Sequence, residues 1–319
     1  MKSRTKRRLA PADLDALTRR ALGAGVRASA EMTDGFANAV WRLTLDDGRD
    51  VVLKLSPPPE LEQLTYERNL LRMEAAAIGL AAGAGVPVAG LVCAGFDDPV
   101  LGGDYLVLDA LPGTPWNQSA PEGGDLRRDL GRLLAVLHSV TGSEWGYPHA
   151  GLTGETWRAA YLAMIGALLD DTERYPTPLP VPAAEIRSIV TAASVALEEV
   201  TTPRLVHFDV WPGNVFLDLE GTPAIQAIID HERAFWGDPL AELITPTIFD
   251  EVREDDPLLA GYREVRPLEL HPVRLDLYRA YLYLILLVEN GPRQYPEEDY
   301  APLRDLATVS LVKALDGLG

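Results

Sequence analysis

The stretch that decides the fold of this chain is Leu205-Val-His-Phe-Asp-Val-Trp-Pro-Gly-Asn-Val-Phe-Leu217, followed closely by Ile228-Ile-Asp-His-Glu232. It places Asn214 five residues after Asp209, and Asp230 sixteen residues after Asn214. A carboxylate that can take up a proton and two oxygen side chains that can bind a hard cation form the set that phosphoryl transfer from ATP requires. The spacing therefore predicts a phosphoryl-transfer site built on these three residues.

Short apolar runs around these residues predict strands and a hairpin. The expected strands cover 204–208, 215–217 and 224–229, with a turn at 219–223. The hairpin brings Asn214 and Asp230 to adjacent strand ends, although they are distant in the sequence. We expect Asp209 to accept or orient the proton of an attacking hydroxyl, while Asn214 and Asp230 hold Mg²⁺.

The segment His207-Phe-Asp-Val-Trp-Pro-Gly-Asn214 resembles the His-Gly-Asp-x-x-x-x-Asn motif of the aminoglycoside phosphotransferase family, whose relatives include choline, fructosamine, macrolide and homoserine kinases. Residues 230–243 also resemble the family's sequence after its metal-binding Asp. The resemblance implies that Asp209 is the catalytic base and that Asn214 and Asp230 bind Mg²⁺. Phe208 stands where the motif usually has Gly, and a bulky side chain there could reshape the floor of the acceptor site.

The amino-terminal half contains the expected parts of a nucleotide-binding lobe. Runs 41–45 and 50–55 are strand-like, and the turn signal Asp46-Asp47-Gly48 separates them. Lys54 lies near the end of the second run and resembles the strand lysine that pairs with the α/β-phosphates in kinases. We therefore expect Lys54 to bind the nucleotide.

A helix expected at 61–82 supplies the acidic partner of this lysine. Glu67 and Glu74 are seven residues apart, so they lie two turns along nearly the same face. One of them should pair with Lys54, and the family resemblance favours Glu74. The apolar stripe of this helix comprises Leu64, Leu71, Ala75 and Ile78.

Two further segments complete the predicted nucleotide site. Gly35 and Asn38 lie in a loop before the first strand, and only the resemblance to the family's Gly-rich, Asn-ending turn favours a nucleotide lid over an ordinary loop. The run 104–113 is an apolar strand that ends in Pro-Gly, which indicates a connector between lobes. It resembles the kinase hinge, where backbone groups near Asp109 and Leu111 would bind the adenine.

Beyond residue 113 the pattern is helical, with helices expected at 125–140, 157–169, 183–200, 240–249, 275–288 and 303–315. The sequence therefore predicts an α+β, bilobal, protein-kinase-like fold, with a small β-rich N-lobe and a larger helical C-lobe. We expect residues 1–112 to form the nucleotide-binding lobe and hinge, and residues 113–319 to carry the catalytic loop and acceptor site. His138, at the end of the first of these helices, is expected to cap or pack.

The composition of the chain limits the classes of molecule that it is expected to bind. A net charge of −18 disfavours nucleic acid and is compatible with a cationic acceptor, although solubility alone explains an acidic chain. The acidic run 251–256 is either a solvated loop or an acceptor lip. Cys93 is the single cysteine, which fits a reducing cytoplasm, and no apolar run is long enough to span a membrane.

We therefore expect an ATP- or GTP-dependent, Mg²⁺-dependent kinase that phosphorylates a hydroxyl of an aminoglycoside-like or other amino-sugar acceptor. A fructosamine or other metabolite kinase is a close alternative, because Trp211 within the motif also resembles fructosamine kinases. A protein kinase is disfavoured, because Asp230-His-Glu replaces Asp-Phe-Gly. A non-catalytic nucleotide-binding module is the alternative from a different class. The sequence leaves the acceptor, the hydroxyl and the oligomeric state open.

Overall fold

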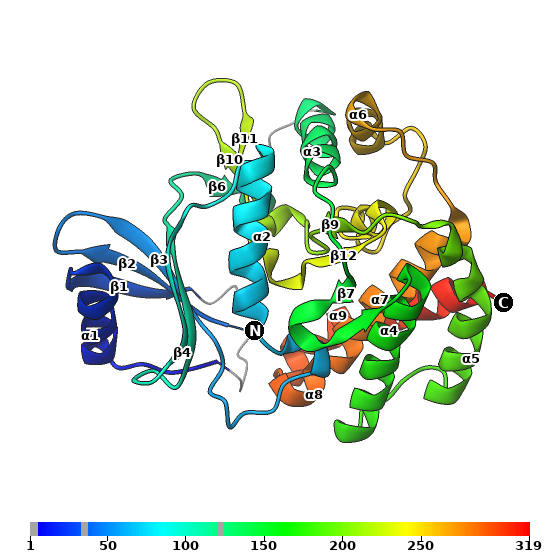
Figure 1. The fold of residues 1–319 in the computed structure, drawn as a ribbon, viewed down its shortest axis with the longest axis horizontal. Helices are drawn as coiled ribbons and strands as arrows, with labels where there is room; N and C mark the ends of the chain where they lie inside the picture. Colours follow the sequence, from blue (N-terminus) through cyan, green and yellow to red (C-terminus); the bar gives the residue numbers. More distant parts are fainter. Residues whose placement is uncertain (1–5, 33–37, 120–123) are drawn as a thin grey trace.

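The computed structural model describes residues 6–32, 38–119 and 124–319. Its amino-terminal part is a five-stranded antiparallel sheet in the order β1-β2-β3-β5-β4 (Figure 1). The strands are β1 (Val26–Met32), β2 (Ala39–Leu45), β3 (Asp50–Leu55), β4 (Leu91–Asp98) and β5 (Gly103–Asp109). Helices α1 (Pro11–Leu22) and α2 (Leu70–Ala84) belong to the same part of the chain.

The two faces of this sheet are covered by different helices. Leu14 and Leu17 of α1 pack on Leu53 and its neighbours on one face. On the other face, Leu71 of α2 packs with Val52. Because side chains alternate along a strand, Lys54 lies on the same face as Val52, which packs against α2. In Figure 1, α2 lies between this sheet and the rest of the molecule.

The carboxyl-terminal part is mainly helical, in agreement with the predicted α+β architecture. Its helices are α3 (Gly124–Leu137), α4 (Trp157–Arg174), α5 (Ala183–Ala193), α6 (Pro257–Val265), α7 (Pro272–Val288), α8 (Asn290–Arg293) and α9 (Glu297–Asp316). Helix α7 is buried along most of its length and forms the centre of the core. In the described residues, no helix is long and apolar enough to cross a membrane.

Two small sheets support the loops between these helices. One has the order β11-β10-β6 and the other β8-β7-β12-β9. Their strands are β6 (Thr114–Pro115), β7 (Trp145–Tyr147), β8 (Leu152–Gly154), β9 (Arg204–Val206), β10 (Val215–Asp218), β11 (Ala224–Ile228) and β12 (Phe235–Gly237). Short 3₁₀ helices comprise η1 (Thr65–Glu67), η2 (Trp116–Gln118), η3 (Pro148–Ala150), η4 (Ser194–Glu199), η5 (Pro212–Asn214), η6 (His231–Arg233) and η7 (Pro239–Ile244). The predicted hairpin is the antiparallel pair β10–β11.

The helix expected at 61–82 begins only at Leu70, so that prediction was wrong at its start. Asn69 has φ of +57°, a left-handed conformation that interrupts a helix. The preceding linker is fastened to the carboxyl-terminal part instead. The backbone N–H of Thr65 donates to Asp171 at 2.7 Å, and the side-chain amide of Asn69 donates to the carbonyl of His149 at 3.0 Å.

Other helix boundaries also differ from the predictions. The helix expected at 183–200 becomes 3₁₀ at Ser194, whose hydroxyl donates back to the carbonyl of Thr191 at 2.8 Å. The helix expected at 240–249 is the short 3₁₀ helix η7, which ends at Ile244, and Phe249 has a left-handed φ of +64°. The last helix begins at Glu297, where three acidic residues favour its first turn. Helices α1 and α6 and strands β1 and β4 were not predicted.

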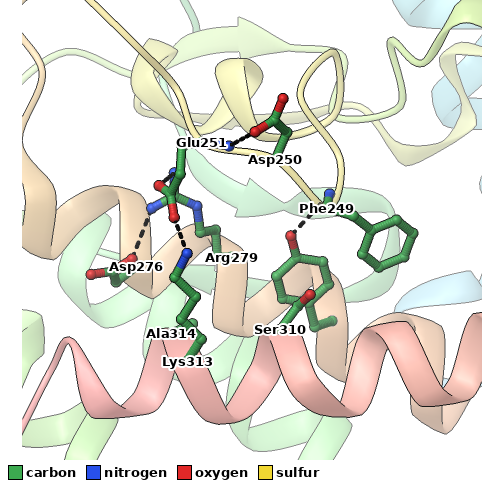
Figure 2. A pocket seen from close by; sticks show the side chains of 9 residues that line it. Phe249, Asp250, Glu251, Asp276, Arg279, Ser310, Lys313 and Ala314 are labelled. Carbon is green, nitrogen blue, oxygen red and sulfur yellow. Dashed lines mark hydrogen bonds and ion pairs between the residues drawn. The ribbon is translucent and has the colours of Figure 1, made fainter.

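The acidic run 251–256 is a loop whose charges are largely paired. Glu251 binds Arg279 of α7 at 2.9 Å and Lys313 of α9, beside a small cavity of about 100 Å³ (Figure 2). Asp256 caps α6 and pairs with Arg127 at 2.6 Å. These carboxylates are thus tied to helices of the carboxyl-terminal part, which disfavours the acceptor-lip alternative.

Candidate active site

A buried glutamate sets the conformation of the loop after β9. The Glu242 carboxylate is fully buried and accepts the backbone N–H of His207 at 2.7 Å and that of Phe208 at 2.9 Å. His138 lies 3.3 Å from the same carboxylate. Burial opposes ionisation of Glu242, but the hydrogen bond from His138 and the nearby histidines lower its pKa. The sequence did not single out Glu242, and it predicted that His138 caps a helix or packs.

Phe208 explains why the motif favours glycine at this position. Its φ of +58° lies in the left-handed region, which glycine adopts without strain and phenylalanine does not. The side chain is fully buried and packs against the rings of Phe235 and Tyr281, with centroid distances of 5.2 Å and 5.7 Å. Phe208 therefore belongs to the core and is not among the described residues that line the main cavity. The expectation that Phe208 reshapes the acceptor floor stays a prediction.

Asp209 and Asn214 are held together by short polar contacts. The side-chain amide of Asn214 donates to the carbonyl of Asp209 at 2.9 Å and to its carboxylate at 3.3 Å. This orientation leaves Oδ1 of Asn214 as the oxygen for a metal ion. Burial raises the pKa of Asp209, and the nearby Arg233 guanidinium, 4.0 Å away, opposes that shift.

The predicted lysine meets two acidic partners from different parts of the chain. Lys54 Nζ lies 2.6 and 2.8 Å from the two carboxylate oxygens of Glu74, and 2.5 Å from Oδ1 of Asp230. Burial disfavours the ammonium form, but the carboxylates of Asp230 and Glu74 raise the pKa of Lys54 above its ordinary value. Glu67 turns away from Lys54 and pairs with Arg293 instead, so the structure resolves the alternative between the two glutamates.

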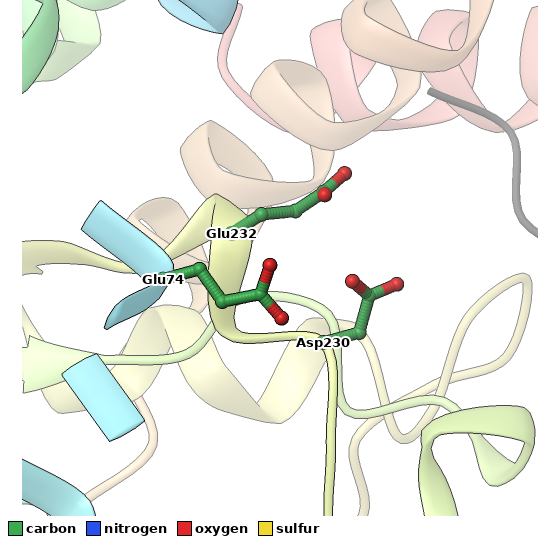
Figure 3. Close-up of side chains that lie close together, drawn as sticks. All are labelled: Glu74, Asp230 and Glu232. Atoms are coloured by element: carbon green, nitrogen blue, oxygen red, sulfur yellow. The ribbon is translucent and has the colours of Figure 1, made fainter. Parts of the chain in front are cut away.

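Three carboxylates converge beside this lysine. Oxygen atoms of Glu74, Asp230 and Glu232 all lie within 4.8 Å of one another (Figure 3). Burial, with the neighbouring Asp230, raises the pKa of Glu232 to about 8. Three carboxylates around one ammonium leave an excess of negative charge, and oxygen ligands suit Mg²⁺. Asn214 and Asp230 both line the main cavity and offer oxygen donors, so these two side chains fit a magnesium ion.

These groups open onto a cavity of about 450 Å³ between the sheet and the carboxyl-terminal part. Asp109 and Leu111 line it, together with apolar side chains from both parts: Met32, Val40, Val52, Ala89, Leu108, Phe216 and Ile229. Asn38 is not among the described lining residues. Its side chain is buried and donates to Glu232 at 2.5 Å. Gly35 lies outside the described residues.

The arrangement has a clear counterpart among known proteins. Residues 30–275 match the model of the phosphotransferase enzyme family. The chain belongs to this family. This membership makes it a phosphotransferase by family, with the kinase-like α+β fold that the sequence predicted.

Individual relatives are similar over large parts of the chain. A protein of Enterococcus faecium assigned as a ketoamine kinase is 28% identical over 196 residues, which are 57% of this chain and 65% of that protein's length. A structure assigned as a fructosamine-3-kinase from Thermobifida fusca has a TM-score of 0.68 at 20% identity, covering 96% of this chain and 98% of its own. An aminoglycoside phosphotransferase, APH(4)-Ia, in a complex with AMP-PNP and hygromycin B, has a TM-score of 0.62 at 18% identity, covering 96% and 98%. These structural likenesses concern the fold.

Proposed function

We propose that this protein transfers the γ-phosphate of ATP, bound with Mg²⁺, to a hydroxyl group of a small sugar-derived acceptor of the ketosamine type. One observation carries the proposal. Lys54 of β3, Glu74 of α2 and Asp230 of the loop after β11 meet in a cavity that Asp209 and Asn214 also line. This combination unites phosphate-binding, metal-binding and proton-accepting groups at one place.

The nucleotide would lie against the apolar wall of the cavity, with its base near the connector after β5. The backbone N–H of Asp109 already donates to Gly90 at 2.8 Å, and that of Ala110 donates to Asp50 at 3.3 Å. The N–H of Leu111 is thus the amide proposed for the base. Lys54, held by Glu74, would bind the phosphates. We propose the cytoplasm as the compartment of the protein, because it supplies ATP for such a reaction.

The acceptor hydroxyl oxygen is proposed to attack the γ-phosphorus while Asp209 takes the hydroxyl proton. The bond between the γ-phosphorus and the β-phosphate oxygen breaks, and ADP leaves. The ring of His207 links the backbone of Asp209 to that of Ile229. His207 Nδ1 accepts the N–H of Asp209 at 3.1 Å, and Nε2 of the same ring donates to the carbonyl of Ile229 at 3.0 Å. Mg²⁺ held by Asn214 and Asp230 would neutralise charge on the phosphates.

Charge in the cavity favours a ketosamine over a polycationic aminoglycoside. The described lining carries five carboxylates and four cationic side chains, so the net charge of −18 is not concentrated there. One of the cations, Arg233, lies 4.0 Å from the carboxylate of Asp209. The described lining as a whole therefore offers no concentrated negative charge that would attract a multiply charged amine. Trp211 adds an indole face suited to a sugar ring. The relatives assigned as ketoamine and fructosamine kinases support the same class.

A panel of ketosamines, aminoglycosides, neutral sugars, choline and macrolides tests the proposal. ADP release and the mass of the phosphorylated product are measured for each, with Asp209→Asn as the inactive control. We expect acceptor-dependent ADP release that is highest with a ketosamine. Preferred turnover of an aminoglycoside would reject the acceptor class. Tight binding of Mg·ATP without phosphate transfer to any acceptor would favour the non-catalytic module.

A further inference from the structure

Glu67, the glutamate that does not pair with Lys54, has a different partner. Its carboxylate is buried, and one oxygen accepts the backbone N–H of Leu64 at 2.8 Å. The other oxygen accepts a hydrogen bond from Nη2 of Arg293, at the end of α8. The linker before α2 is therefore joined to the far end of the chain by a buried ion pair.

The ion pair continues toward the proposed catalytic base. Nη1 of Arg293 donates to Oε2 of Glu289 at 2.8 Å. The same oxygen accepts Nη2 of Arg233 at 3.0 Å, and Nη1 of Arg233 lies 4.0 Å from Oδ1 of Asp209. Glu67, Arg293, Glu289 and Arg233 thus form one buried ion network that ends at Asp209. Each of the four side chains is at most 9% exposed.

The sharing of one oxygen has a geometric consequence. Both arginines bind Oε2 of Glu289, so Arg233 makes a single hydrogen bond to that carboxylate. An arginine alone with a carboxylate favours two parallel hydrogen bonds. If Arg293 were absent, the Glu289 carboxylate could rotate and bind Arg233 through both oxygens. That rotation would draw the guanidinium of Arg233 away from Asp209.

We propose that Arg293 is a positioning residue for phosphoryl transfer: by holding Oε2 of Glu289, and by its own tie to Glu67, it keeps Arg233 directed at Asp209. The inference rests on the proposed function. Stability alone does not account for four buried charges, because well-packed apolar residues are often as stable as a buried ion pair. Arg233 and Arg293 also line the cavity, which places the network where the acceptor would bind.

The test compares Arg293→Met with Arg174→Met, using the full chain and its best acceptor. Arg174 is the matched control, because it ties the same linker to the carboxyl-terminal part through the carbonyl of Gln63 at 3.3 Å but does not contact the ion network. We expect Arg293→Met to lower kcat by up to about 100-fold, the cost of a misplacement of about 1 Å. The KM for Mg·ATP should change little, because the Lys54–Glu74 pair is intact. Arg174→Met should leave kcat near that of the wild type.

Two further variants separate positioning from folding. The double variant Arg293→Met/Glu67→Gln removes one charge of each sign, so it should recover much of the Tm lost by Arg293→Met while kcat stays low. Arg293→Lys keeps the charge but cannot bridge Glu289 and Glu67 in the same way, and it should give an intermediate kcat. It also carries the test if Arg293→Met does not fold.

The outcomes distinguish the inference from the proposed function. An unchanged kcat in Arg293→Met or Arg293→Lys, or an equal loss in Arg174→Met, would overturn the positioning role. Recovery of kcat together with Tm in the double variant would show that the network is only structural. Failure of the wild-type protein to transfer phosphate to any acceptor would overturn the proposed function, and this inference with it.

Discussion

Two groups of buried charged residues beside the main cavity differ in their charge balance. In the first, the acidic cluster, Glu74, Asp230 and Glu232 surround the ammonium of Lys54. In the second, the ion network, two guanidinium groups face two carboxylates, those of Glu67 and Glu289. The acidic cluster has an excess of negative charge. The ion network, counted without Asp209, has equal numbers of positive and negative groups.

This difference in charge balance indicates which of the two groups of residues depends on a cationic ligand. Uncompensated buried charge is costly, so a cluster with excess carboxylate is completed by a cation or by protons. Glu232 reflects this cost, because burial and the neighbouring Asp230 raise its pKa to about 8. The balanced network has no such requirement, and its role is to hold side chains in place. This contrast supports the proposal that Mg·ATP binds beside the acidic cluster and that the ion network orients the acceptor.

The largest expected effect comes from removing the proposed base, Asp209. Asp209→Asn keeps the shape of the side chain but discards the carboxylate, so kcat should fall by about 10²–10⁴-fold, the range for a general base. Nucleotide affinity should change little. In the wild type, kcat should fall as pH drops through a pKa above the ordinary 3.8 of Asp, because burial raises it. Steady-state kinetics across pH measure both, and near-normal turnover of the variant would assign the base elsewhere.

A second test contrasts the stability of the two clusters directly. Arg293→Met leaves Glu67 and Glu289 enclosed and should cost about 3–5 kcal/mol of unfolding free energy, as for breaking a buried pair. Lys54→Met leaves the fully buried carboxylate of Glu74 without its ammonium, so a comparable loss is expected when no divalent cation is present. Millimolar Mg²⁺ should restore the Tm of Lys54→Met but not that of Arg293→Met. If Mg²⁺ changed the Tm of Lys54→Met and Arg293→Met equally, the distinction between the acidic cluster and the ion network would be contradicted.

The two proposed metal ligands should not be equivalent. Asp230→Ala removes a charged ligand, whereas Asn214→Ala removes a neutral one, so the former should weaken the use of Mg²⁺ more severely. We expect the half-saturating Mg²⁺ concentration to rise by at least about 10–100-fold for Asp230→Ala, since even a supporting group costs that much. A Mg²⁺ titration of turnover at fixed ATP measures this. Equal, mild effects of both variants would reject the assignment.

The loop after β9, which contains Phe208, should show a smaller, conformational effect. Phe208→Gly and Phe208→Ala both empty the same core site, but only glycine is free of strain at φ of +58°. The glycine variant should be the more stable of the two by about 1 kcal/mol. Phe235, which packs against Phe208 in β12, is the control, because the usual advantage of alanine should hold there. Denaturant unfolding of the four variants decides, and a more stable Phe208→Ala would contradict the role of φ.

The smallest expected effect is the response of acceptor binding to salt. Because the cavity lining is nearly balanced in charge, the acceptor KM should stay flat as the Debye length falls from about 10 Å at 0.1 M salt to about 3 Å at 1 M. Acceptor and ATP are varied separately, with free Mg²⁺ held constant. A KM that rises markedly with salt would instead favour a cationic acceptor.

The sequence by itself determined the parts of the site that depend on local spacing. Asp209, Asn214 and Asp230 lie on one loop and one hairpin, so short-range strand and turn patterns were enough to bring them together. Lys54 was recognisable because it lies near the end of a strand-like run, where it resembles the strand lysine of kinases. The succession of strand-like and then helical patterns likewise predicted the α+β architecture.

The tertiary structure alone decided the partners of buried charges. Glu67 and Glu74 share a face only if one helix contains both, and the left-handed Asn69 breaks that helix. Glu242 and Arg293 find their partners 35 and 226 residues away, and no local periodicity encodes such a distance. Burial makes an unpaired charge too costly to leave, but which opposite charge lies within reach depends on how the whole chain packs.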